Sequence, residues 1–160
     1  MATALLFLLP WLGVCGYALW RGGQPERLVG GLFLLAFILS IITNRLGMQW
    51  HGVEVGTMGV DTALLIALLA IALRANRYWP IGMAAMQLLQ VMGHLLKIAD
   101  PRMLPLLYWI SSVVWAYPML VLLWLGTLRH HNRVKRFGPE SSWSDSSGRS
   151  AAIDRDSPIG

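Results

Sequence analysis

The sequence has 160 residues, of which 56% are hydrophobic and 13% are charged, whereas about 25% of the residues of a typical soluble domain are charged. The formal net charge is +5 at pH 7, and the single cysteine, Cys15, excludes a disulfide within the chain. This composition excludes an ordinary water-soluble domain. The connections between the apolar stretches are too short for a soluble catalytic domain, so we do not expect an enzyme.

Five apolar stretches follow one another along the chain, and each is long enough to cross a hydrocarbon layer about 30 Å thick at about 1.5 Å per residue. No Lys or Arg precedes the first stretch, so we expect it to be retained as a span and not cleaved as a signal peptide. The sequence therefore predicts an all-α integral membrane protein, a five-span up-and-down transmembrane helix bundle with short loops over residues 1–137. The predicted spans are Ala4–Trp20, Leu28–Asn44, Thr57–Leu73, Ile81–Ile98 and Leu104–Gly126.

Two features within these stretches predict details of the helices. Pro10 and Pro118 lie inside the first and fifth stretches, where we expect local kinks. In the third stretch Gly59, Ala63 and Ala67 repeat every four residues. Such a row of small side chains lets a neighbouring helix pack closely.

Lys and Arg are distributed unevenly over the two ends of the predicted bundle, and this bias predicts its orientation. Eight of them lie in the first and third connections and directly after the fifth stretch, which share one end of the bundle. Three lie at the opposite end. The positive-inside rule places the N-terminus outside and the C-terminus in the cytoplasm. Short loops and a basic C-terminal flank are typical of a bacterial inner (plasma) membrane protein, and we expect that location.

The residues after the fifth stretch are of two kinds. A basic cluster follows the span directly, and we expect it to contact lipid headgroups and to fix the topology. No aromatic interleaving accompanies the cluster, so nucleic acid is not an expected partner. Residues 138–160 contain seven serines and few apolar side chains, which predicts a disordered cytoplasmic tail. The basic cluster consists of Arg129, Arg133, Lys135 and Arg136.

The fourth stretch differs from the others because it carries a polar stripe. Gln87, Gln90, His94 and Lys97 are spaced three, four and three residues apart, so they occupy an arc of about 80° on a helix. Ionisable side chains are costly in hydrocarbon, so the stripe should face the bundle interior or water. Asp61, in the third stretch, lies at about the same depth as His94. We therefore expect Asp61 to pair with His94 or Lys97.

The polar residues permit several interpretations. Ser111 and Ser112 fall at a similar depth in the fifth stretch and complete a candidate pocket open to the outside. The same residues are compatible with structural hydrogen bonds between helices, or with a site for a proton, an ion or a small solute. Haem binding through His51 and His94 is a remote alternative, because these histidines show no diagnostic spacing. We expect neither a metal nor another cofactor.

The sequence leaves two hypotheses for the function. The first is a non-enzymatic accessory or scaffold subunit that associates with other membrane proteins or with itself, since five short helices expose little besides lipid-facing surface. The second is transport of a proton, an ion or a small solute through the polar pocket between the third and fourth stretches. The lipid bilayer is the expected surrounding in both cases.

Overall fold

The computed structural model describes residues 2–47, 49–50, 53–75, 77–100, 102, 104, 106–108, 110 and 114–137. Apart from a short hairpin, the described chain is helical, which confirms the predicted all-α class. Residues 106–108 add a short helical turn between the last two long helices. The long helices are α1 (Ala2–Arg21), α2 (Gln24–Arg45), α3 (Val55–Arg74), α4 (Trp79–Ala99) and α6 (Ala116–Phe137).

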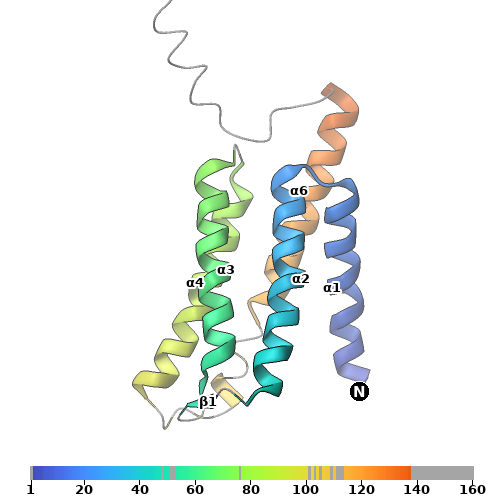
Figure 1. Ribbon diagram of the computed structural model, residues 1–160. Helices are drawn as coiled ribbons and strands as arrows, with labels where there is room; N and C mark the ends of the chain where they lie inside the picture. Colours follow the sequence, from blue (N-terminus) through green and yellow to red (C-terminus); the bar gives the residue numbers. More distant parts are fainter. Residues whose placement is uncertain are drawn as a thin grey trace, which may run out of the picture.

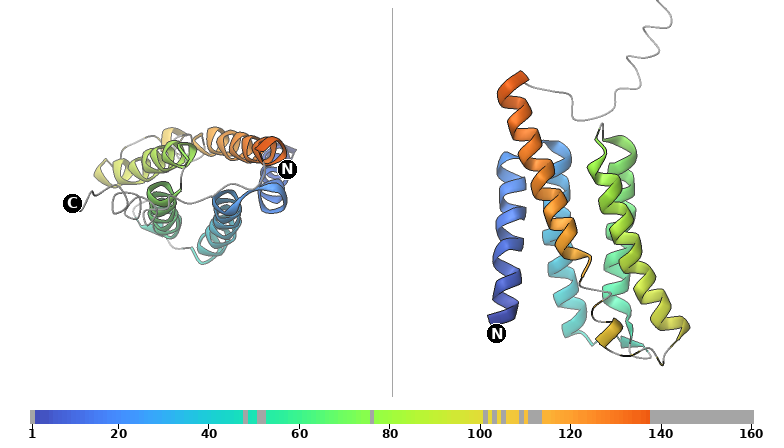
Figure 2. Two further views of the ribbon diagram at one scale, coloured as in Figure 1. Left: turned by 90° about the horizontal axis from the view of Figure 1, so that it is seen from above. Right: turned by 180° about the vertical axis from the view of Figure 1, so that it is seen from behind.

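The long helices run up and down beside one another (Figure 1). In Figure 1 the chain starts at the lower end of the bundle, and α6 finishes at the upper end. Each of the first four helices packs against the next one, and α6 packs against both α1 and α4. Seen from above, the five helices therefore surround a common interior (Figure 2). This arrangement lets side chains from all five helices meet around one site.

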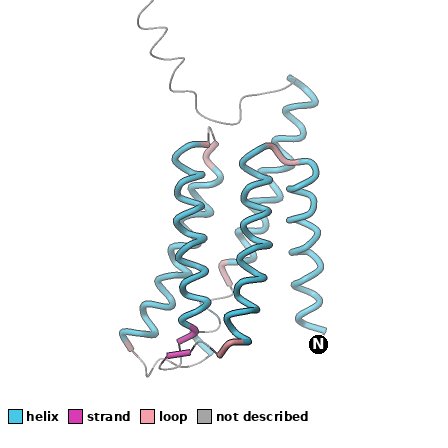
Figure 3. The backbone as a smooth tube through the Cα atoms, viewed as in Figure 1, coloured by secondary structure: helices cyan, strands magenta, loops and turns pink. Residues whose placement is uncertain are grey.

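The connections are short and explain where the helices begin. Only Gly22 and Gly23 separate α1 from α2, and Pro25 lies in the first turn of α2, where its missing N–H costs no helical hydrogen bond. At the lower end, β1 (Gln49–Trp50) and β2 (Val53–Glu54) pair in antiparallel fashion between α2 and α3 (Figure 3). The first four helices begin two to four residues before the predicted spans, because a helix can include residues at its start that lie outside the apolar stretch.

The fifth predicted span is wrong in its boundaries. The sequence predicts one helix over residues 104–126, whereas α6 starts at Ala116 and continues to Phe137. Pro118 lies in the first turn of α6, a position that tolerates proline, so it marks the start of this helix and not a kink within it. The apolar pattern before residue 116 belongs partly to the short turn at residues 106–108. By contrast, Pro10 lies within α1, whose helical assignment is unbroken.

The interior combines a close-packed apolar core with a few polar groups. Leu68, Met83 and Leu123 are fully buried in the core, and the rings of Trp11 and Phe37 lie 4.6 Å apart between their centroids. Large apolar side chains also cover the outside: Leu73 is 84% exposed, for example. Such an apolar exterior around a partly polar interior suits a lipid surrounding better than water.

Within the described residues, α2, α3 and α4 are long and apolar enough to cross a membrane. These three helices indicate a membrane protein. Two members of the small-residue row of α3, Gly59 and Ala63, are exposed within the described part of the chain, and an added Cβ at Gly59 would meet nothing within 4 Å.

Candidate functional site

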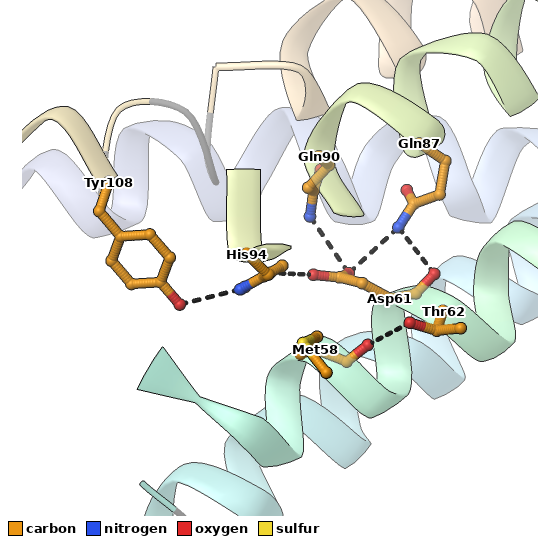
Figure 4. A network of polar contacts seen from close by, with 7 residues as sticks. All are labelled: Met58, Asp61, Thr62, Gln87, Gln90, His94 and Tyr108. Atoms are coloured by element: carbon orange, nitrogen blue, oxygen red, sulfur yellow. Dashed lines mark hydrogen bonds and ion pairs between the residues drawn. The ribbon is translucent and has the colours of Figure 1, made fainter. Parts of the chain in front are cut away.

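A carboxylate lies inside the bundle, between α3 and α4. Asp61 is 6% exposed, and its side chain accepts three hydrogen bonds from α4 (Figure 4). The amide nitrogens of Gln87 and Gln90 donate to Oδ1 over 3.2 and 3.1 Å, and Nε2 of His94 lies 2.9 Å from Oδ2. Gln87 also donates to the backbone carbonyl of Asp61, over 3.2 Å. The surroundings therefore suit an ionised carboxylate, which only accepts hydrogen bonds.

His94 is the central residue of this cluster. It is 1% exposed, and its two ring nitrogens face different partners: Nε2 faces Asp61, and Nδ1 lies 2.8 Å from the hydroxyl of Tyr108. The rings of His94 and Tyr108 meet edge to face, with centroids 5.5 Å apart. Tyr108, His94 and Asp61 thus form a chain of hydrogen bonds that leads from the short turn near the lower end into the bundle (Figure 4).

A cavity of about 150 Å³ adjoins Asp61 on the side of the two glutamines. A water molecule takes about 30 Å³, so the cavity has room for several. Its wall combines the polar atoms of Asp61, Gln87 and Gln90 with aromatic and apolar side chains from α1, α2, α3 and α6. These other lining residues are Trp11, Phe33, Ala36, Phe37, Ser40, Leu64, Ala116 and Met119.

The structure brings together four of the residues predicted to form the site: Asp61, Gln87, Gln90 and His94. Of the two predicted pairings of Asp61, it forms the one with His94. Lys97 is 6% exposed and follows His94 by one helical turn, so it also belongs to the buried face of α4. The other two predicted members, Ser111 and Ser112, lie outside the described residues, as does His51.

Tyr108 was not predicted as a site residue, because it lies in the fifth apolar stretch and outside the polar stripe of the fourth. Its hydroxyl contacts His94 because the chain turns back after α4 and places residues 106–108 against that helix. The available signal was its position near the predicted outer boundary, on the same side of the membrane as His94. Thr62, the neighbour of Asp61, donates to Met58 within its own helix and adds nothing to the cluster (Figure 4).

A second buried polar cluster lies at the upper end. Glu26, at the start of α2, is fully buried, and its Oε1 lies 2.5 Å from Nη1 of Arg77, in the connection between α3 and α4. Nη2 of the same guanidinium lies 2.9 Å from Nδ1 of His130, on α6. Arg77 therefore ties three parts of the chain together. In the sequence, Arg77 contributes only to the count of basic residues that predicts the orientation, and this cluster is not predicted.

The protonation state of His130 follows from its partner. A guanidinium has only donors, so Nδ1 of His130 must accept the hydrogen bond from Arg77, and this requires an imidazole without a proton on Nδ1. Gly23 lies against this group: an added Cβ there would approach the His130 ring and a Glu26 oxygen at 3.0 Å. A side chain at position 23 would therefore require the His130 ring or the Glu26 carboxylate to shift.

Two further observations bear on the class of protein. Within the described residues, no group of three or more His, Cys, Asp and Glu side chains is arranged to hold a metal ion. No protein-family model matches the chain, and comparisons with curated proteins and with solved structures find no match.

Proposed function

We propose that this chain is a five-span membrane protein that binds and releases a proton at the Asp61–His94 pair and thereby moves protons, or a small polar solute coupled to them, across the membrane. The observation that carries the proposal is the position of His94, between a carboxylate and a hydroxyl and beside a cavity. Following the positive-inside rule, the lower end faces the outside of the cell and the upper end faces the cytoplasm, in a bacterial inner membrane.

The proposal is supported by the fact that both charge states of His94 keep partners for both ring nitrogens. In the neutral ring, Nε2–H donates to Asp61 while Nδ1 accepts from the Tyr108 hydroxyl. In the charged ring, Nδ1–H donates to the same hydroxyl, which turns to accept. The ring nitrogens of His94 therefore keep hydrogen-bond partners in either charge state, which supports proton exchange at this residue.

The arrangement of the interior gives the proposed path a direction. From the lower end, Tyr108 and His94 lead to Asp61 and the cavity. Toward the upper end the interior contains fully buried apolar side chains, such as Leu68, Met83 and Leu123. The Glu26–Arg77 ion pair lies at the upper end itself. We therefore infer that protons reach Asp61 from the lower end through Tyr108 and His94, and that transport requires a second conformation that opens the upper end.

Proton flux into liposomes tests the proposal. The purified protein is reconstituted with a pH-sensitive dye inside, and a potassium gradient with valinomycin drives proton entry. We expect flux above that of protein-free liposomes for the wild type. Asp61→Asn should abolish this excess, and His94→Gln should reduce it by at least about tenfold, because each removes a proton-accepting group in contact with the other.

Two matched variants test whether removing any carboxylate or any imidazole, outside the proposed site, also lowers the flux. Asp100→Asn removes an exposed carboxylate at the lower end, and His131→Gln removes a partly exposed imidazole at the upper end. Both should retain wild-type flux. The proposal fails if the wild type conducts no faster than protein-free liposomes. It also fails if folded Asp61→Asn conducts as fast as the wild type.

The second candidate function is that of an accessory subunit, and the outward position of the small-residue row on α3 favours it. Gly59 and Ala63 face away from the rest of the chain, so a helix of another chain, or of a second copy, has close access to α3. Gly59→Leu together with Ala63→Leu should then lower the molar mass of the purified particle in mild detergent, measured by light scattering. An unchanged mass with both leucines present contradicts association through this row.

A further inference from the structure

A groove of about 600 Å³ lies at the upper end, between the start of α4 and the second half of α6. It is separate from the Asp61 cavity, and no residue lines both. Among the described residues that line it there are four arginines and no acidic side chain. The lining residues are Arg77, Tyr78, Trp79, Leu122, Leu125, Gly126, Arg129, Asn132, Arg133 and Arg136.

The α6 side of the groove changes character along the helix. Leu122, Leu125 and Gly126 are followed on the same helical face by Arg129, Arg133 and Arg136, at spacings of three or four residues. At about 1.5 Å per residue the arginines extend over about 10 Å, and they start about 6 Å above Leu125. The groove is thus apolar toward the middle of the membrane and cationic toward its surface.

The positive charge of the groove comes mainly from α6. The guanidinium of Arg77 is 5% exposed and already faces Glu26 and His130. By contrast, Arg129 and Arg136 are exposed. A guanidinium forms paired hydrogen bonds with phosphate oxygens and is the preferred side chain for that recognition.

Trp79 contributes a second, independent feature. An added Cβ at Gly126 would lie 3.1 Å from the Trp79 ring, so the absence of a side chain at Gly126 lets the indole pack directly on α6. The Nε1 atom of Trp79 is buried and has no hydrogen-bond partner in the part of the chain that the structure describes. A buried N–H without an acceptor is costly, and a ligand oxygen in the groove would satisfy it.

We propose that this groove binds an anionic phospholipid, whose phosphate lies among the arginines of α6 and whose acyl chains follow Leu122, Leu125 and Trp79. The shared chemistry of the ligand is a phosphate anion. The apolar half of the groove selects the lipid over free phosphate, because it would remain unfilled by the ion alone. The inference rests on insertion in a membrane, and it is independent of proton exchange at Asp61.

Lipid binding to the full chain in a zwitterionic detergent tests the inference. The protein is titrated with phosphatidylglycerol, with phosphatidylcholine of the same acyl chains, and with inorganic phosphate, and bound lipid is counted by native mass spectrometry. We expect phosphatidylglycerol to bind at least about tenfold more tightly than phosphatidylcholine. Arg129→Gln with Arg136→Gln should remove at least about tenfold of that affinity, because hydrogen bonds to charged groups are lost.

The matched control removes two charges at the same end but outside the groove. Arg21 and Arg27 are exposed, and neither lines the groove. Arg21→Gln with Arg27→Gln should change the affinity for phosphatidylglycerol by less than about threefold, as expected for screened surface charges. An equal loss in both double variants would show diffuse attraction to the surface and would overturn the site. Inorganic phosphate binding as tightly as phosphatidylglycerol would overturn the lipid as ligand.

Trp79→Phe distinguishes binding in the groove from a general attraction of anionic lipid to the arginines. It keeps an aromatic ring at position 79, and it removes the Nε1–H donor together with the second ring of the indole. We expect the affinity for phosphatidylglycerol to fall by about fivefold, the effect of one hydrogen bond, with no change in affinity for inorganic phosphate. An unchanged affinity for phosphatidylglycerol would exclude the wall formed by Trp79 from the binding site.

Discussion

The two buried polar clusters contain similar groups in a different order. At the lower end the order is Tyr108, His94, Asp61, with the imidazole in the middle. At the upper end it is Glu26, Arg77, His130, with the guanidinium in the middle. Each cluster joins a carboxylate to an imidazole through buried contacts. The middle group decides what each cluster does chemically.

A guanidinium does not lose its proton at any pH that the protein meets, whereas an imidazole does so near neutrality. Arg77 therefore keeps a fixed charge, which the buried Glu26 balances. Removing either partner leaves the other charge exposed to an apolar surrounding. In the proposed function, His94 is the group that takes up and releases a proton between its two neighbours. The upper cluster is thus suited to holding helices together, and the lower one to the proposed exchange of protons.

The largest expected effect tests the structural role of the upper cluster. Arg77→Met leaves the carboxylate of Glu26 fully buried without its cation, and we expect the free energy of unfolding to fall by about 3 to 5 kcal/mol. Denaturation in mixed detergent micelles, followed by circular dichroism, measures this change. Glu26→Gln combined with Arg77→Met removes both charges and should recover most of the loss.

Arg27→Met serves as the control for that measurement, because Arg27 is exposed near the same end of the bundle. Its substitution should change the free energy of unfolding by less than about 0.5 kcal/mol. If the double variant is as unstable as Arg77→Met alone, an unpaired buried charge is not the cause. The upper cluster would then stabilise the fold through the packing of the arginine stem.

A smaller effect is expected when the phenol is removed from the lower cluster. Tyr108→Phe keeps the ring beside His94 and removes the hydroxyl that faces Nδ1. We expect the free energy of unfolding to fall by about 1 kcal/mol and proton flux to fall by about tenfold, since a hydrogen bond to an ionised group contributes about 1.5 kcal/mol. Stability and liposome flux are measured on the same preparation.

Tyr78→Phe is the matched control, because Tyr78 is 91% exposed and lies near the upper end, at the start of α4. It should alter neither quantity. Unchanged flux in Tyr108→Phe would mean that protons reach His94 without the phenol. The proposed lower cluster would then consist of the acid, the imidazole and the glutamines alone.

The difference between the clusters also explains how far the sequence was informative. The contact between Asp61 and His94 was predictable because the polar stripe repeats at the helical period and because the short connection between α3 and α4 brings equal depths together. Gln87 and Gln90 share that stripe, and both donate to Asp61. Helical periodicity and depth are local properties, so a single sequence carries them.

The remaining site residues depend on tertiary packing that no local pattern encodes. Glu26 and Arg77 are 51 residues apart in sequence, and Arg77 and His130 are 53 apart. Glu26 lies in the first turn of α2 and Arg77 in a connection, where polar residues are expected for many reasons, and His130 lies among basic residues in the second half of α6. The error at residues 104–126 has a similar origin, because the apolar composition continues through a break in the helix before Ala116. Hydropathy detects apolar surroundings, and it does not detect where a backbone turns.

The smallest expected effect concerns the pH dependence of stability that comes from His131, on the surface beside the upper cluster. Partial burial of its imidazole, and then the charges of Lys135 and Arg21, lower the pKa of His131 from its ordinary value of 6.5. In the unfolded chain this histidine therefore binds a proton at a higher pH than in the folded chain. The unfolded state holds more protons around and below pH 6.5, so stability falls as the pH is lowered through that range.

His131→Gln should remove this part of the pH dependence, seen as a smaller drop in melting temperature between pH 7.5 and pH 5.5. The difference from the wild type should shrink in high salt, because Lys135 and Arg21 act through solvent. His130 is present in both proteins, so its contribution cancels in the comparison. If His131→Gln loses as much stability on acidification as the wild type, the lowered pKa of His131 does not contribute to the pH dependence of the free energy of unfolding.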